Sequence, residues 1–427
     1  MMKSKVRAPE APTAGPAEAI RRPAMQPRGS TAGAHRPGAR LRIALVGDAE
    51  SPHLLKWARA LAPQVELWVA SSRGFAPAFE PLVPSWRRLA LGGQSDHAGG
   101  NIGLLKTLPR LARWLQQVDA DWINAHYLTS HGTLAWAAKR GWRLRGRLLG
   151  SAWGSDILVT PQRHAAYRWV TQRVLRACAL STSDSEHMAR AMRDLGAGEV
   201  RVLPFGLERM PPPPPGKQPW LFFANRGLEP IYRPQAVIEL FAALAARRPE
   251  ARLVVANDGS LRPALEARVA SLGLGERVRF TGRVQAAEQD RLYARAPWYL
   301  SLPESDSVAV SVLEALAHGC VPLLSDLPAN HELVHSGDNG LVLDAALVAR
   351  LAAAAPTHTA SAPMSAGTAA AGCVDPRDPA ITRLDAELQT LAGRSPDIAR
   401  TNRAWVQEHA MFAPGVTALL ARLRELS

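Results

Sequence analysis

The stretch Ser301-Leu-Pro-Glu-Ser-Asp-Ser-Val-Ala-Val-Ser-Val-Leu-Glu-Ala-Leu-Ala-His-Gly-Cys-Val-Pro-Leu-Leu-Ser325 decides the fold. An apolar strand ends in a polar loop, a helix is predicted to open near Val308–Val310, and Gly319 ends it before a second strand. Asp306 lies in the loop and Glu314 within the helix. A helix N-terminus presents free amides to a phosphate, and nearby carboxylates accept hydrogen bonds from sugar hydroxyls. Spacing alone favours a plainer interpretation, a capped helix with one exposed carboxylate.

The alternation of short apolar runs and longer helical patterns extends over most of the chain, and it predicts parallel sheets covered by helices on both sides. Predicted strands before residue 210 are Arg42–Val46, Val65–Ser71, Trp122–Asn124, Arg147–Leu149, Ala179–Ser183 and Val200–Leu203. Later strands are Leu221–Ala224, Leu253–Ala256, Val278–Thr281, Trp298–Leu302 and Val321–Ser325. Predicted helices are His53–Ala62, with Lys56 off its apolar face, Pro234–Ala246, Leu261–Leu272, Ala286–Ala294 and Ser311–His318.

Proline divides the chain into two halves. The run Pro211–Pro215 cannot continue a helix or a central strand, so residues 209–219 are predicted to form a stiff linker. The predicted fold class is therefore α/β, with one Rossmann-like domain over residues 41–208 and a second over 220–344. Residues 345–396 are interpreted as a low-complexity connection, and 397–427 as a C-terminal helix that breaks near Pro414.

Charge is concentrated at the N-terminus. Of the net charge of +14 over 427 residues, residues 1–40 carry +6 and are rich in Ala, Pro and Gly, so they are predicted to form a disordered basic tail. The remaining basic balance suits an anionic substrate or an acidic membrane surface, and no recognised motif supports nucleic acid as a partner. A run of basic residues around Trp142 fits an anionic lipid surface, although such a run is more often a solvated face. Its members are Lys139, Arg140, Arg143, Arg145 and Arg147.

Several classes of protein are disfavoured. No apolar run approaches the roughly 20 residues that a membrane-spanning helix needs. The three cysteines form no C-x-x-C pair, which argues against a disulfide scaffold or a structural zinc site and fits a reducing, cytoplasmic setting. No G-x-G-x-x-G follows the first strand, which counts against a dehydrogenase.

Residues 301–325 resemble the signature of family 4 glycosyltransferases of group 1 type, which have the GT-B fold. That signature has two Glu separated by seven residues, followed by Ala-Met-Ala-x-Gly-x-Pro-Val. Here Asp306 stands at the first acidic position and Glu314 at the second, and Glu314–Gly319 and Pro322 follow the pattern. The resemblance covers most of residues 41–344 and returns at 402–409. It implies two Rossmann-like domains facing each other across a cleft, and sugar transfer with retention and without a metal; no D-x-D motif stands in a plausible loop.

The resemblance also implies the residues that bind the donor. Leu221–Leu228 resembles the opening strand of the family's donor domain, whose Arg binds the diphosphate, and this Arg corresponds to Arg226. The family's Lys that follows is absent, so Arg233 is the candidate for a second cation. Phe280–Val284 resembles the segment whose backbone faces the nucleotide base. The implied donor-binding residues are Arg226, Arg233, Glu314, Asp306, Ala309, Val310, Arg283 and Val284.

In the first domain, Asp121–Tyr127 resembles a segment whose His faces the cleft, here His126. Ser151–Asp156 resembles a segment that usually ends His-Gly-x-Asp, with Trp153 in place of that His. Asp156 is either a ligand of a sugar hydroxyl or a helix cap. The implied catalytic residues are Asp306, Arg226 and His126, and those on the acceptor or sugar side are His53, Trp153 and Asp156.

The first interpretation is a cytoplasmic glycosyltransferase, or one peripheral at the inner face of the membrane. It would move a sugar from a UDP- or GDP-linked donor, with no other cofactor, to a glycan or lipid-linked acceptor in cell-surface polysaccharide or glycolipid assembly. Two alternatives stay open, because Asp306 and Trp153 depart from the usual residues. One is a non-catalytic relative that binds a sugar nucleotide, and the other is a nucleotide-sugar epimerase of the same fold.

Overall fold

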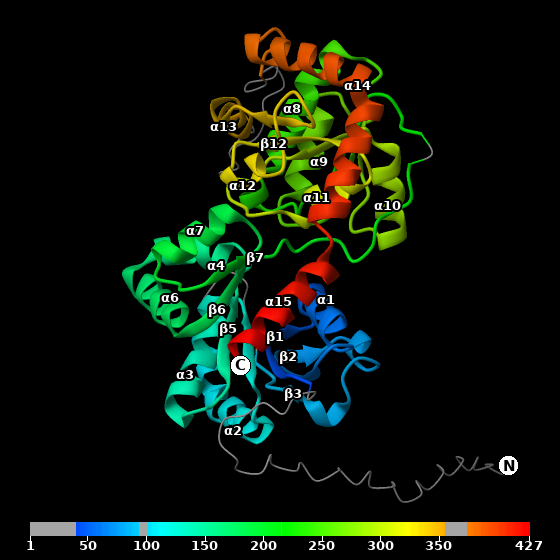
Figure 1. Ribbon diagram of the computed structural model, residues 1–427. Coiled ribbons are helices and arrows are strands. Elements are labelled where there is room, and N and C mark those ends of the chain that lie inside the picture. The colour runs from blue at the N-terminus through cyan, green and yellow to red at the C-terminus, as the bar shows by residue number, and fades with distance from the viewer. Residues whose placement is uncertain (1–39, 94–100, 215, 355–373) are drawn as a thin grey trace, which may run out of the picture. The chain divides into compact units, whose positions relative to one another are not determined.

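A computed structural model describes residues 40–93, 101–214, 216–354 and 374–427 (Figure 1). The predicted tail, residues 1–40, lies outside this part of the chain except for Arg40.

The first domain is built on a seven-stranded parallel sheet of order β3-β2-β1-β4-β5-β6-β7. Its strands are β1 Arg42–Ala49, β2 Glu66–Phe75, β3 Arg88–Ala90, β4 Trp122–His126, β5 Arg147–Ser151, β6 Cys178–Ser183 and β7 Val200–Val202. Its helices are α1 Pro52–Leu61, α2 Leu108–Val118, α3 Thr133–Trp142, α4 Ser155–Leu158, α5 Thr160–Arg163, α6 Ala165–Ala177 and α7 Glu186–Asp194. Seven of the eight residues of β1 are buried, as expected for a strand covered on both faces.

The second domain is built on a six-stranded parallel sheet of order β10-β9-β8-β11-β12-β13. Its strands are β8 Leu221–Ala224, β9 Arg252–Val255, β10 Val278–Phe280, β11 Trp298–Ser301, β12 Val321–Ser325 and β13 Leu341–Leu343. Its helices are α8 Pro234–Arg247, α9 Arg262–Ser271, α10 Ala286–Arg295, α11 Val310–Ala317, α12 Pro328–His331, α13 Ala345–Ala353 and the long α14 Pro379–His409.

Both sheets confirm the predicted α/β class with two Rossmann-like domains. In each sheet the strand order reverses at the first strand, between β1 and β4 and between β8 and β11. Ligands of such folds bind beyond the carboxyl ends of the strands at this switch point. Arg226 follows β8 by two residues and Asp306 follows β11 by five, so both lie at that edge.

The prediction of a low-complexity connection over residues 345–396 is wrong at both ends, where residues 345–353 form α13 and residues 379–396 belong to α14. Asp344 caps α13 by accepting from the backbone N–H groups of Ala346 and Leu347, at 2.9 and 3.1 Å. Asp378 caps α14 in the same way, and the buried leucines of both helices join the core of the second domain. Alanine made this stretch look featureless, but it is also the strongest helix former. Residues 355–373 lie outside the described part of the chain.

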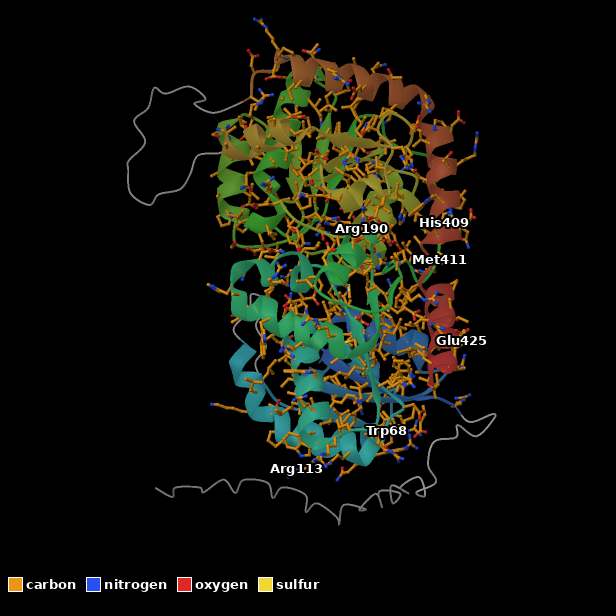
Figure 2. The ribbon with its side chains drawn as sticks, turned by 60° about the vertical axis from the view of Figure 1, so that its left-hand side comes forward. Trp68, Arg113, Arg190, His409, Met411 and Glu425 are labelled. Atoms are coloured by element: carbon orange, nitrogen blue, oxygen red, sulfur yellow. The ribbon has the colours of Figure 1, made fainter. Side chains whose placement is uncertain are left out.

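The C-terminal helix is longer than predicted and breaks elsewhere. Residues 397–409 belong to α14, and the break falls at Ala410 and Met411, between the labelled His409 and α15, Phe412–Leu426 (Figure 2). Pro414 lies in the first turn of α15, where its missing N–H leaves no helical hydrogen bond unmade. Phe412, Val416 and Leu420 of α15 pack in the core of the first domain, so this last helix belongs to that domain.

Candidate functional site

A cleft of about 570 Å³ lies at the carboxyl ends of the strands. Residues at or after the ends of β1, β5, β6 and β7 line it from the first domain, and residues after β8, β9, β10 and β11 line it from the second. Of the predicted site residues, those lining the cleft are His53, Trp153, Arg226, Asp306, Ala309, Val310 and Glu314. The remainder, His126, Asp156, Arg233, Arg283 and Val284, lie outside its lining.

Arg226 is held in place by neighbours on three sides. Its Nη2 donates to Asp306 Oδ2 at 2.5 Å, and its Nη1 donates to Ser311 Oγ at 3.2 Å. Its guanidinium carbon lies 4.4 Å from the centre of the Tyr232 ring. Burial raises the pKa of Asp306, although the charge of Arg226 acts against this shift. The arrangement presents a fixed, partly buried cation to the cleft.

The N-terminus of α11 lies beside this cation. Ala309 stands at the cap position and makes no side-chain capping hydrogen bond, and Ala309, Val310 and Ser311 all line the cleft. The first amides of a helix have no partner within the helix, and they carry the positive end of its dipole. Arg226 and these amides therefore form one electropositive corner that suits an anion.

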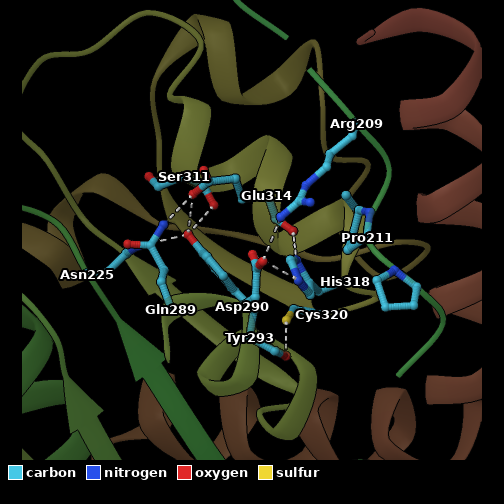
Figure 3. Close-up of polar contacts among 12 residues, drawn as sticks. Arg209, Pro211, Asn225, Gln289, Asp290, Tyr293, Ser311, Glu314, His318 and Cys320 are labelled. Atoms are coloured by element: carbon cyan, nitrogen blue, oxygen red, sulfur yellow. Dashed lines mark hydrogen bonds and ion pairs between the residues drawn. The ribbon is translucent and has the colours of Figure 1, made fainter. Parts of the chain in front are cut away.

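Glu314 lies on the same helix, within a network of hydrogen bonds (Figure 3). Its Oε2 accepts from the Tyr293 hydroxyl at 3.1 Å and from Gln289 Nε2 at 3.0 Å. The Tyr293 hydroxyl in turn accepts from Asn225 Nδ2 at 2.9 Å. Burial raises the pKa of Glu314 to about 6. Within the described ranges, its second oxygen, Oε1, accepts no hydrogen bond.

The first-domain wall is aromatic. The ring of His53 meets those of Trp153 and Phe205 edge to face, each with centroids 4.9 Å apart. Behind them, Trp153 Nε1 donates to His126 Nδ1 at 3.2 Å. Burial lowers the pKa of His126 to about 3, and the side chain is 1% exposed. His126 is therefore a neutral support beneath Trp153 rather than a group facing the cleft.

Comparison with known proteins places this geometry in a family. Residues 207–356 match the model of "Glycosyl transferases group 1", and residues 42–189 match that of "Glycosyl transferase 4-like". The chain belongs to the group 1 glycosyltransferases. The resemblance of residues 301–325 is thus confirmed at the level of the family.

Curated relatives match this glycosyltransferase over short segments. One is GDP-mannose:cellobiosyl-diphosphopolyprenol alpha-mannosyltransferase of Xanthomonas campestris, 27% identical over 113 residues, which is 25% of this chain and 29% of the relative. Another is alpha-monoglucosyldiacylglycerol synthase of Streptococcus pneumoniae, 29% identical over 100 residues, which is 23% of each chain. The chain thus matches less than a third of the length of these relatives.

Solved structures show the same fold over most of the chain. Anabaena HepE in complex with UDP superposes with a TM-score of 0.65 at 15% identity, covering 90% of this chain and 100% of that one. Sucrose-phosphate synthase of Thermosynechococcus elongatus superposes with a TM-score of 0.63 at 16% identity, covering 91% and 100%. These likenesses confirm the predicted GT-B fold.

Asp156 of this glycosyltransferase is a buried scaffold residue. It is fully buried, and its carboxylate accepts from the backbone N–H groups of Leu128 at 2.8 Å and Trp153 at 2.9 Å. Burial raises its pKa to about 6. The predicted helix cap is wrong, because Asp156 lies within α4 and Gly154 stands at the cap position. Asp156 is a structural residue of another kind, since it fixes the backbone that carries Trp153.

Three predicted donor residues lie away from the cleft lining. Arg233 precedes α8 with a φ of 45°, and its guanidinium pairs with Glu304 at 3.6 Å. Arg283 is exposed, and Val284 packs against the core around β8 and β11. Their assignment to the donor rests on the resemblance alone, and strand ends alone do not determine where a side chain points.

Among the residues of the cleft region that escaped prediction, two are acidic or basic. Asp184 follows β6 directly and lines the cleft; it accepts a hydrogen bond from the Ser307 hydroxyl, and burial raises its pKa to about 7. Lys56 is 9% exposed and donates to the carbonyls of Phe205 and Gly206; burial lowers its pKa to about 8. Its predicted place off the apolar face of α1 is wrong. The position of Asp184 directly after a predicted strand was the available signal.

Metal ligands and membrane spans were searched for within the described ranges. There, no group of three or more His, Cys, Asp or Glu side chains stands where it could hold a metal ion. No helix of this part of the chain is both long and apolar enough to cross a bilayer.

Proposed function

We propose that this glycosyltransferase moves a sugar from a nucleotide-diphosphate sugar to an acceptor hydroxyl with retention of configuration. The observation that carries the proposal is the pairing of Arg226 with the N-terminus of α11 in the cleft. A leaving nucleoside diphosphate gains negative charge as the sugar departs. Fixed positive groups aimed at that charge are usually the largest contribution to catalysis.

Seven of the cleft residues would have a place in this reaction. The Arg226 fork and the amides of Val310 and Ser311 would hold the diphosphate, since guanidinium matches phosphate with two parallel hydrogen bonds. Glu314 would accept from ribose hydroxyls, and Asp306, which orients Arg226, would face the donor sugar. His53 and Trp153 would contact the acceptor or the sugar.

The relatives support the substrate classes. Their names include a GDP-linked donor, a diphosphopolyprenol and a diacylglycerol product, and one solved neighbour binds UDP. We therefore propose a UDP- or GDP-linked donor and a glycan or lipid-linked acceptor in cell-surface polysaccharide or glycolipid assembly. Work on such an acceptor would take place at the cytoplasmic face of the membrane, with the protein bound peripherally.

A ligand screen followed by a product assay tests the proposal. The full chain would be heated with UDP, GDP, ADP and their sugars, with and without magnesium. Saturation at 100 times Kd adds about 2.7 kcal/mol to the free energy of unfolding, which gives a measurable rise in Tm. The stabilising sugar nucleotide is then assayed for slow hydrolysis, and the anomeric proton of the released sugar is followed by NMR. Binding without hydrolysis or transfer would favour a non-catalytic relative, and exchange of the C2 hydrogen with solvent would favour an epimerase.

A further inference from the structure

Gln162–Trp169, around the start of α6, form an exposed and aromatic surface. All eight residues of this run are exposed. Trp169 is 52% exposed and Tyr167 39% exposed, and the Arg173 guanidinium lies 5.2 Å from the Trp169 ring centre. We call the side chains of Arg163, Tyr167, Arg168, Trp169 and Arg173 the α6 face. Trp and Tyr suit a surface where one end of the ring is apolar and the other wet, so their exposure beside these arginines is compatible with a partner.

The charge of this region is one-sided. Residues 157–183 contain four arginines and no acidic residue. The longer segment 139–193 carries eleven Lys and Arg and three Asp and Glu, a net charge of +8 that equals the net charge of all residues 41–427. Within the described chain, Arg168 makes no ion pair. The partner should therefore be anionic.

Topology puts the α6 face at the edge of the domain that holds the cleft. A crossover helix of a parallel sheet runs opposite to its strands, so the start of α6 lies at the carboxyl ends of β5 and β6. Ser151 and Thr182, at the ends of those two strands, line the cleft. The basic run Lys139–Arg147 extends from the end of α3 to the first residue of β5 and so lies at the opposite edge. Its Lys139 is used internally, donating to the carbonyls of Leu144 at 2.9 Å and Gly146 at 2.7 Å.

We propose that the α6 face docks on an anionic lipid surface, and that this contact brings the cleft to the membrane. Arginines gain from the negative surface potential of such a membrane, while Trp and Tyr prefer the headgroup level, where one part of the ring is apolar and the other wet. This inference rests on the proposed function and names the surface by which the protein would bind the membrane. Its test needs neither a donor nor an acceptor.

Vesicle co-sedimentation of the full chain tests the docking surface. The vesicles are phosphatidylcholine alone, or phosphatidylcholine with 30% phosphatidylglycerol as a stated probe composition. We expect binding only to the anionic vesicles, falling steeply with salt. Arg168→Glu and Trp169→Ala should each weaken it about ten-fold or more.

Matched variants at the opposite edge localise the contact. Arg145→Glu changes the charge equally, and Trp86→Ala removes an aromatic side chain that is 38% exposed just before β3. Every variant keeps residues 1–40, so their basic charge contributes equally to all measurements. Equal losses in the control variants would overturn the assignment to α6, and absence of binding to anionic vesicles would overturn the proposal. Self-association that depends on Trp169 in sedimentation velocity would also overturn it, since a second copy would then cover the face. If Arg168→Glu loses vesicle binding but still binds the sugar nucleotide, the loss concerns the docking surface alone and leaves the proposed function intact.

Discussion

Replacing Arg226 separates its observed role, as a partner of Asp306, from its proposed role, as a ligand of the donor diphosphate. Arg226→Met keeps an unbranched apolar stem and removes the guanidinium. Removing one member of a fully buried ion pair costs about 3–5 kcal/mol, because the other charge stays buried without a partner. The Arg226 and Asp306 side chains remain 18% and 23% exposed. Solvent screening then lowers the expected loss in free energy of unfolding to about 2 kcal/mol.

The effect on the donor should be larger than this stability loss suggests. Hydrogen bonds to charged groups contribute about 1.5–3 kcal/mol each, so losing the fork should raise the Kd for the nucleotide sugar by about 10- to 100-fold. Asp306→Asn removes the carboxylate charge and leaves the amide oxygen as an acceptor for Arg226. In the double variant no charge is left unpaired, so much of the stability lost in Arg226→Met should return.

Titration calorimetry and urea unfolding of the two single variants and the double variant complete the cycle. If Arg226 binds the diphosphate, the double variant regains stability but not affinity. Recovery of affinity together with stability would refute the argument, because Arg226 would then act only by neutralising Asp306. Arg383→Met serves as a matched control: Arg383 is 83% exposed and pairs with Glu387 on α14, so its loss should change neither quantity measurably.

Three further variants test the charges of the interior. Glu314→Gln should weaken nucleotide binding about ten-fold yet raise stability at pH 8, because burial raises the pKa of Glu314 to about 6 and the amide carries no charge; calorimetry and urea unfolding report the two effects. Burial raises the pKa of Asp184 to about 7, so the folded protein holds a proton there that the unfolded chain releases above pH ~4, and this group lowers stability as pH rises from about 4 to 7. Asp184→Asn should therefore be more stable than the wild type at pH 8 but not at pH 4, and a pH-independent difference in Tm would contradict this. Glu239→Gln should cost about 3 kcal/mol in urea unfolding, since Arg268 bonds both oxygens of the fully buried carboxylate at 2.6 and 3.0 Å, and an unchanged midpoint would show that the pair is dispensable.

Much of the fold was predictable because buried parallel strands are short, continuous apolar runs. Leu221–Ala224 and Val321–Ser325 begin and end where predicted. Two edge strands were missed, β3 Arg88–Ala90 and β13 Leu341–Leu343. Each has three residues, too few to show a periodic pattern of hydrophobic residues. Each is a strand because it forms backbone hydrogen bonds with its neighbour, β3 with β2 and β13 with β12.

The candidate site was predictable where the course of the backbone alone determines the position of a residue. Arg226 and Asp306 follow strands that the topology brings side by side, so their meeting follows from the fold. Side-chain surroundings were not predictable in this way. Whether Asp156 faces a ligand or the interior depends on amides of Leu128 and Trp153, and the first of these is 28 residues away in the chain.

The two walls of the cleft differ in chemistry, and this difference supports the proposed placement of the donor and the acceptor. The second-domain wall supplies Arg226 and helix amides, which suit a diphosphate, whereas the first-domain wall supplies aromatic rings, which suit the apolar face of a sugar. Trp153 stands where the resembled segment has a His, and His126 beneath it stays neutral because burial lowers its pKa to about 3. Among the described residues lining this wall, His53 and Asp184 are the titratable ones. We infer that the proton lost by the acceptor hydroxyl passes to one of these two or to the departing phosphate. A pH–rate profile that keeps its shape in Asp184→Asn and His53→Gln would leave the phosphate as the acceptor of that proton.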